Sequence, residues 1–72
     1  MHEFTRFPFT GSVSRSNGRV WHWQLNIIGG GVIDQGTAFC EVDDGAEALD
    51  AMHAARRKAL AELREQMEET NG

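Results

Sequence analysis

Apolar and polar side chains alternate along RVWHWQLNII, residues 19–28, with the period of two that is typical of a β-strand. Trp21, Trp23 and Leu25 fall on one face, and polar side chains fall between them on the other. Similar runs cover residues 6–15 and residues 32–42. The pattern therefore predicts three strands that share one apolar face.

The period changes to that of a helix over residues 45–68, where alanine is abundant and proline is absent. Asp44 is predicted to cap this helix, with Glu47 completing a capping box. The apolar stripe consists of Ala48, Leu49, Met52, Ala55, Ala59, Leu60, Leu63 and Met67. One long C-terminal helix is expected.

The segment RSNGR predicts a hairpin between the first two strands. A two-residue Asn-Gly turn would place Val13 opposite His22, whereas a three-residue loop places Val13 opposite Trp21. The longer loop gathers the large apolar side chains on one face, since a slip of one residue would scatter them. We therefore predict a three-residue loop in which Gly18 is left-handed.

The third strand is expected to pair back on the second after a reversal at glycines 29–31. This pairing would put the small Ala38 opposite the large Trp23, which favours a filled core. It would also put Asp34 on the core face, near the end of the sheet. A bulge at Gly36 is the alternative, because it would switch the alternation.

Together these elements predict one α+β domain over residues 1–72, a three-stranded antiparallel β-meander followed by a long α-helix on one face (β-β-β-α). The predicted helix is about 35 Å long and an eight-residue strand about 27 Å. The helix should therefore overhang the sheet by a turn or so. Leu63 and Met67 would then lack cover, which favours self-association as a homodimer.

The composition is that of a small, acidic globular domain: 72 residues, 40% hydrophobic, with a formal net charge of −4. That charge disfavours a partner bound mainly through phosphates. No apolar run reaches membrane-spanning length, and no signal-peptide core follows the first residues. Cys40 is the one cysteine. A lone thiol is typical of a reducing compartment, so we expect a cytoplasmic protein without membrane contact.

The residues usual in metal and catalytic sites are few and scattered. Cys40 and the three histidines have no short ligand spacing, so no metal is expected. Glycines 29–31 lack the lysine-serine pair of a phosphate loop, so no cofactor is expected either. One helix on a small sheet offers little concavity in which to exclude water. The sequence therefore predicts no catalytic residues and no enzymatic activity.

Two surfaces are candidates for binding another macromolecule. The first is the sheet face opposite the tryptophans, where mixed polar and aromatic side chains suit recognition. Its candidate residues are His22, Gln24, Asn26, Thr37 and Phe39, with Arg15 and Arg19 side by side at the hairpin end. The second is acidic and could occupy a basic groove on a target. Its candidate residues are Glu41, Asp43, Asp44 and Glu65.

The run NGRVWHWQLNIIGGGVIDQGTAFCEVDDGAEALDAMHAA, with the small size, acidic charge and alanine-rich helix, resembles anti-CRISPR proteins encoded by phages and mobile elements. Those proteins block type I interference complexes. They are mostly non-enzymatic and cover a functional surface on a Cas subunit. The resemblance implies an inhibitor that binds a Cas subunit or complex.

The same run is also similar to the three-stranded-sheet DNA-binding domains of some phage-type integrases, which lay the sheet in the major groove. That resemblance implies DNA binding through the sheet. The second and third predicted strands of this chain, however, carry one cation, Arg19, against two acids, Asp34 and Glu41. We therefore predict a protein-binding module first, a DNA-binding domain second and a homodimeric accessory protein third.

Overall fold

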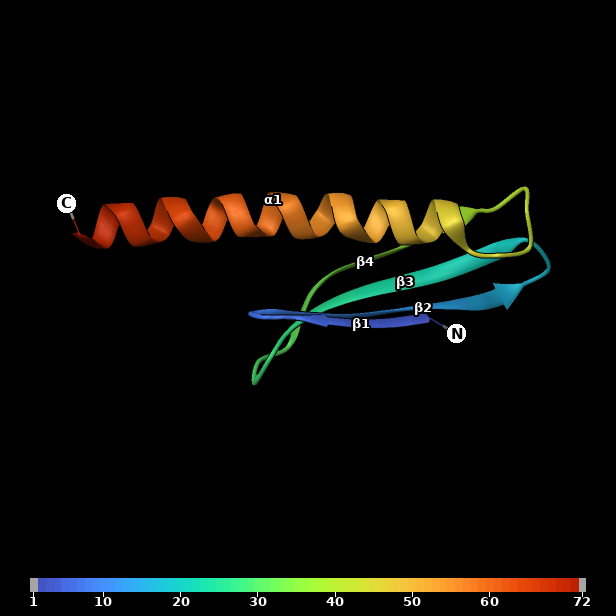
Figure 1. Cartoon of the computed structure of the whole chain (residues 1–72), viewed down its shortest axis with the longest axis horizontal. Coiled ribbons are helices and arrows are strands. Elements are labelled where there is room, and N and C mark those ends of the chain that lie inside the picture. Colours follow the sequence, from blue (N-terminus) through green and yellow to red (C-terminus); the bar gives the residue numbers. More distant parts are fainter. Residues whose placement is uncertain (1, 72) are drawn as a thin grey trace.

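The chain folds into an antiparallel sheet with one long helix across it (Figure 1). The computed structural model describes residues 2–71, and the side chains of residues 2–68. The strands are β1 (His2–Arg6), β2 (Phe9–Asn17), β3 (Val20–Ile27) and β4 (Val32–Phe39), in the order β1-β2-β3-β4, and the helix is α1 (Ala46–Asn71). The predicted α+β class and C-terminal helix are confirmed. The prediction of three strands is wrong, because the sheet has four.

The additional strand, β1, comes from the first residues of the chain. β1 pairs with β2 so that Phe4 lies opposite Gly11, where it covers the space that a side chain would otherwise fill. The predicted first strand, residues 6–15, ran through Pro8, but the chain reverses there. The Phe7–Pro8 peptide is cis, and the Pro8 carbonyl accepts a hydrogen bond from Ile28 N at 2.9 Å. Pro8 therefore lies in a turn and not within an edge strand.

The β2–β3 hairpin differs from the prediction by two residues in register. Val13 lies opposite Trp23, and Asn17 pairs with Val20 across a tight turn that contains Gly18 at φ 56°. The ladder is irregular between Arg15 and Asn17, where the bulge takes up one residue. The three-residue loop is therefore wrong. A shift of two residues keeps every side chain on its predicted face, so the apolar face is as expected.

The β3–β4 register is also shifted by two residues. Ala38 lies opposite Trp21, and Gly36 lies opposite Trp23. A Cβ atom at Gly36 would come within 2.8 Å of the Trp23 ring, so this glycine gives the indole its space. The irregularity lies between Leu25 and Asn26 of β3, and not at Gly36. β4 ends at Phe39, short of the predicted boundary at residue 42.

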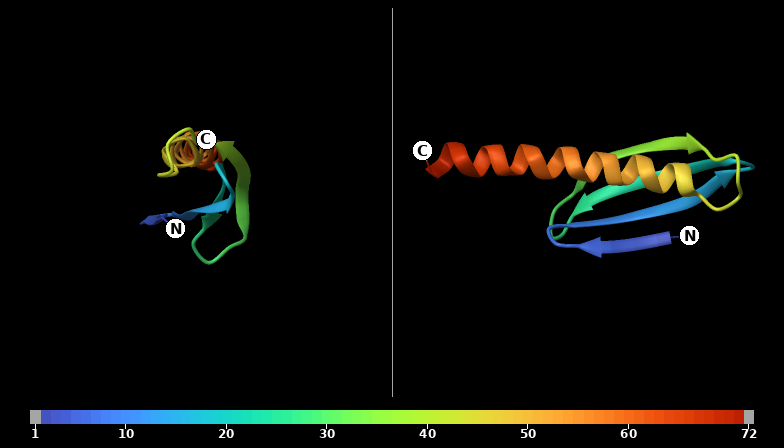
Figure 2. Two further views of the ribbon diagram at one scale, coloured as in Figure 1. Left: turned by 90° about the vertical axis from the view of Figure 1, so that its right-hand side faces the viewer. Right: turned by 45° about the horizontal axis from the view of Figure 1, so that its top comes forward.

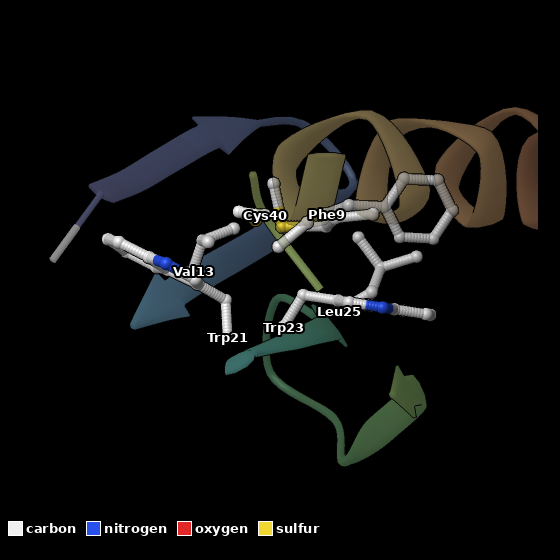
Figure 3. Packing of buried hydrophobic residues seen from close by; sticks show 8 residues of the cluster. Phe9, Val13, Trp21, Trp23, Leu25 and Cys40 are labelled. Carbon is white, nitrogen blue, oxygen red and sulfur yellow. The ribbon is translucent and has the colours of Figure 1, made fainter. Parts of the chain in front are cut away.

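The core lies between α1 and the sheet face that carries the tryptophans (Figure 3). Trp21 and Trp23 are only 5% and 8% exposed and share a buried cluster with Ala48 and Met52 of α1, which confirms that they lie on the helix side of the sheet. Asp34 shares this face, as expected, and stays exposed at the end of the sheet. The buried cluster consists of Phe9, Val13, Trp21, Trp23, Leu25, Cys40, Ala48 and Met52.

The start of α1 is built differently from the predicted capping box. The first i to i+4 bond runs from Leu49 N to the carbonyl of Gly45, whose φ is 74°. Asp44 Oδ1 accepts a hydrogen bond from Ala46 N at 2.9 Å, while Asp44 N donates to the Val42 carbonyl at 2.8 Å. The Asp44 N–H is therefore bonded within the loop and not to a glutamate side chain.

The helix is much longer than the strands on which it packs. Twenty-six residues make a helix of about 39 Å, and its C-terminal part projects past the turns of the sheet (Figure 1). The sheet curls toward the helix when seen along the helix axis (Figure 2). The predicted overhang is confirmed and exceeds one turn. Within the described residues, no helix is long and apolar enough to cross a membrane.

Candidate functional site: the open face of the sheet

The sheet face turned away from α1, called the open face here, carries rows of polar side chains that meet across the strands. Ser12 pairs with Gln24, which pairs with Gln35 of β4. Gln24 Nε2 donates a hydrogen bond to Asn26 Oδ1 at 3.1 Å along β3. Ser12, Gln24 and Asn26 are half-buried because neighbours on the same face flank them, whereas Gln35 is exposed. The predicted residues Gln24 and Asn26 therefore share one ordered polar surface.

The hairpin end of the open face is apolar as well as polar. Val20 lies opposite Phe39, and the next row on the same face pairs His22 with Thr37. Phe39 is 61% exposed and Val20 is 39% exposed. We call Val20, His22, Thr37 and Phe39 the hairpin patch. Three of its four residues are predicted site residues, which the β3–β4 pairing brings into contact range of one another.

Arg15 does not belong to this patch, contrary to the prediction. It lies opposite Trp21 on the helix-facing side, with its guanidinium carbon 5.6 Å from the centre of the indole ring. The same guanidinium forms an ion pair with Asp43. Two predicted binding residues therefore bind each other. The bulge between Arg15 and Asn17 also separates Arg15 from Arg19, which lies exposed in the turn.

The acidic residues of the β4–α1 loop take part in local structure. The Asp44 carbonyl accepts a hydrogen bond from His2 Nε2 at 3.1 Å, and the His2 ring stacks on Trp21 at 6.1 Å. Glu41 is exposed beyond the end of β4. Glu65 lies in α1, about 28 Å along the helix from its first residue and so far from this loop. The predicted acidic set is therefore divided between two ends of the molecule.

Cys40, like the tryptophans, belongs to the buried core. Among the described residues, no three His, Cys, Asp or Glu side chains are grouped so that they could hold a metal ion. A shallow depression of about 290 Å³ crosses the open face beside β1, and Gln24 and Asn26 line one side of it. Polar side chains supply most of its wall, including Glu3 and Thr5 of β1. The sequence alternation of His2–Arg6 was the signal that could have placed these two residues on this face.

Ile33 lies beside the helix. It lines a groove with Ala59 and Leu63 of α1. The irregularity between Leu25 and Asn26 turns Ile33 toward the helix, because the extra residue in β4 breaks the alternation there. This apolar groove is a second surface, which the sequence pattern did not reveal.

No protein-family model, curated protein or solved structure is similar enough to this chain to match it.

Proposed function

We propose that this protein is a small, non-enzymatic module that binds another protein through the hairpin patch on the open face. The exposure of Phe39 carries this proposal. A phenylalanine that is 61% exposed beside the apolar Val20, within a polar surface, is typical of the centre of a protein interface. Exposed Arg19 and Glu41 lie at the margin, where charges select a partner.

The sharpest form of the proposal is an inhibitor of the anti-CRISPR type, whose target is a Cas subunit or complex of a type I system. The resemblance of residues 17–55 supports this form. The net charge of −4 supports it as well, because surfaces that hold nucleic acid are basic and attract acidic proteins. Inhibition would then follow from coverage of a functional surface, with no reaction required.

DNA binding is less well supported. Of the two arginines in β2 and the hairpin turn, Arg15 faces the helix side and pairs with Asp43, and Arg19 is exposed in the turn. Glu3 adds an acid to the same face. A sheet that reads DNA needs several cations aimed at phosphates and bases.

The test is binding of the purified chain to purified type I interference complexes, by size-exclusion chromatography and surface-based kinetics. It is combined with plasmid interference in cells that express the same complexes. Phe39→Ala should weaken binding by about 30-fold or more, as expected for loss of a central aromatic residue. Phe7→Ala is the matched control, because Phe7 is 87% exposed in the β1–β2 turn, away from the patch. Its affinity should equal that of the native chain.

Three results would contradict the proposal: no association with any tested complex, equal loss with both variants, or unchanged affinity of Phe39→Ala. A mobility shift on duplex DNA at low salt that weakens steeply as salt rises would instead favour the DNA-binding alternative.

A further inference from the structure

The C-terminal part of α1 leaves the sheet before the helix ends. Among the described residues, the helix side chains that pack on the core end at Leu60. The helix continues to Asn71, so about 16 Å of it extends beyond that point. Figure 1 and the right-hand view of Figure 2 show this part projecting past the turns of the sheet. An apolar stripe on it has little of its own sheet to contact.

That stripe continues into the projecting part. Leu63 is half-buried, and Met67, one turn further on, is 60% exposed. An open groove of about 260 Å³ lies where the helix leaves the sheet, and we call it the overhang groove. It is lined by Phe9, Ile27, Ile33, Ala59, Glu62, Leu63 and Gln66. The walls are mostly apolar, and the polar residues come from the helix.

The surroundings of the overhang groove are acidic. A second depression shares Ile33, Ala59 and Glu62 with it and adds Asp34 and Lys58. Further along the helix, residues 62–68 contain three glutamates and one arginine. An apolar groove with this excess of negative charge is complementary to an apolar segment that carries lysine or arginine.

A second copy of this chain fits the overhang poorly. Two projecting helices related by a two-fold axis, whether parallel or antiparallel, would bring the glutamates of residues 62–68 close to one another. Like charges at that distance oppose association. An anionic membrane surface would be repelled for the same reason. Charge therefore selects a basic occupant.

We propose that the overhang groove binds a basic amphipathic helical segment of another protein. The apolar side chains of that segment would contact Ile33 and Leu63, and its cations would lie beside Glu62 and Glu65. This is the helix-in-groove mode of recognition, in which anchors one turn apart enter an apolar groove. The overhang groove shares no residue with the hairpin patch, so this proposal does not depend on the proposed function.

The probe is a fluorescein-labelled 18-residue synthetic peptide with leucines along one helical face and lysines on the other. Its fluorescence anisotropy is measured with increasing amounts of the full chain. The control peptide carries glutamate in place of each lysine. The lysine peptide should bind, its affinity should fall as salt rises, and the glutamate peptide should bind at least tenfold more weakly. Backbone amide shifts should map the bound peptide to Ile33 and Leu63.

Variants then locate the site. Leu63→Ser combined with Ile33→Ser should weaken the lysine peptide at least tenfold, and circular dichroism checks that the double variant folds. If it does not fold, Met67→Ser is used instead, because its side chain is largely exposed, with a threefold or greater loss expected. Phe39→Ala and Val42→Ala, at the opposite end of the sheet, are the matched controls and should bind as the native chain does.

Four outcomes would overturn the proposal. They are no binding up to about 1 mM, equal binding of both peptides, equal affinity for the folded groove variant and the native chain, and amide shifts confined to residues 41–44. Light scattering tests whether a second copy of this chain occupies the groove instead. A species of about 16 kDa, twice the 8.0 kDa of one chain, that Met67→Ser converts to monomer would assign the groove to a second copy.

Discussion

At the scale of single residues, two glycines with left-handed backbone allow the cost of backbone strain to be compared with the cost of side-chain crowding. Gly18 and Gly45 both have positive φ, but a Cβ atom at Gly18 meets nothing, whereas at Gly45 it would lie 2.9 Å from the Trp21 ring. Gly18→Ala should therefore cost about 1 kcal/mol of unfolding free energy from the backbone alone. Gly45→Ala should cost roughly 2–4 kcal/mol, because the alanine also displaces the indole.

Urea denaturation of both variants beside the native chain measures this difference. Equal losses would mean that Trp21 moves aside freely, which would also weaken the ring contacts that Trp21 makes with Arg15 and His2. Arg15 lies over the Trp21 ring and forms an ion pair with Asp43. Its role in binding a partner stays a prediction.

At the scale of elements, β1 depends on Phe4. Its ring lies over Gly11 and meets His53 of α1 edge-on at 5.2 Å, so one side chain joins an edge strand to the helix. Phe4→Ala should lower the unfolding free energy by about 1.5–3 kcal/mol, below the cost for a fully buried phenylalanine because Phe4 is half-buried. Hydrogen exchange should show loss of protection in β1 first.

Phe7→Ala is the control for that prediction as well, and it should change stability by less than about 0.5 kcal/mol because Phe7 is exposed. If Phe4→Ala behaves like Phe7→Ala, or if exchange in β1 matches exchange in β3, the view that Phe4 holds β1 on the sheet is wrong.

At the scale of the whole molecule, folding and the overhang should be separable. The helix packs on the core only as far as Leu60 among the described residues. A chain that ends after Leu63 should therefore keep its fold and lose no more than about 1 kcal/mol of unfolding free energy. Thermal and urea unfolding, compared with the native chain at the same concentration, test this. A loss above about 2 kcal/mol would show that residues after Leu63 stabilise the core.

The sequence by itself determined which side chains face inward. Alternation in β2 and β3 placed Phe9, Val13 and both tryptophans on one face, and the helical stripe supplied Ala48 and Met52 to cover them. These assignments survived errors in register, because a shift of two residues leaves each side chain on the same face. The open face, with Gln24 and Asn26, followed for the same reason.

The tertiary structure alone decided how those faces are joined. The pairing of Arg15 with Asp43 and the position of Ile33 beside α1 depend on residues far apart in the sequence. No local pattern encodes such contacts, because each is stabilised by the space and charge that other elements provide. The overhang groove is the clearest case: Ile33 and Leu63 line it together because the irregularity in the β3–β4 ladder turns Ile33 toward the helix.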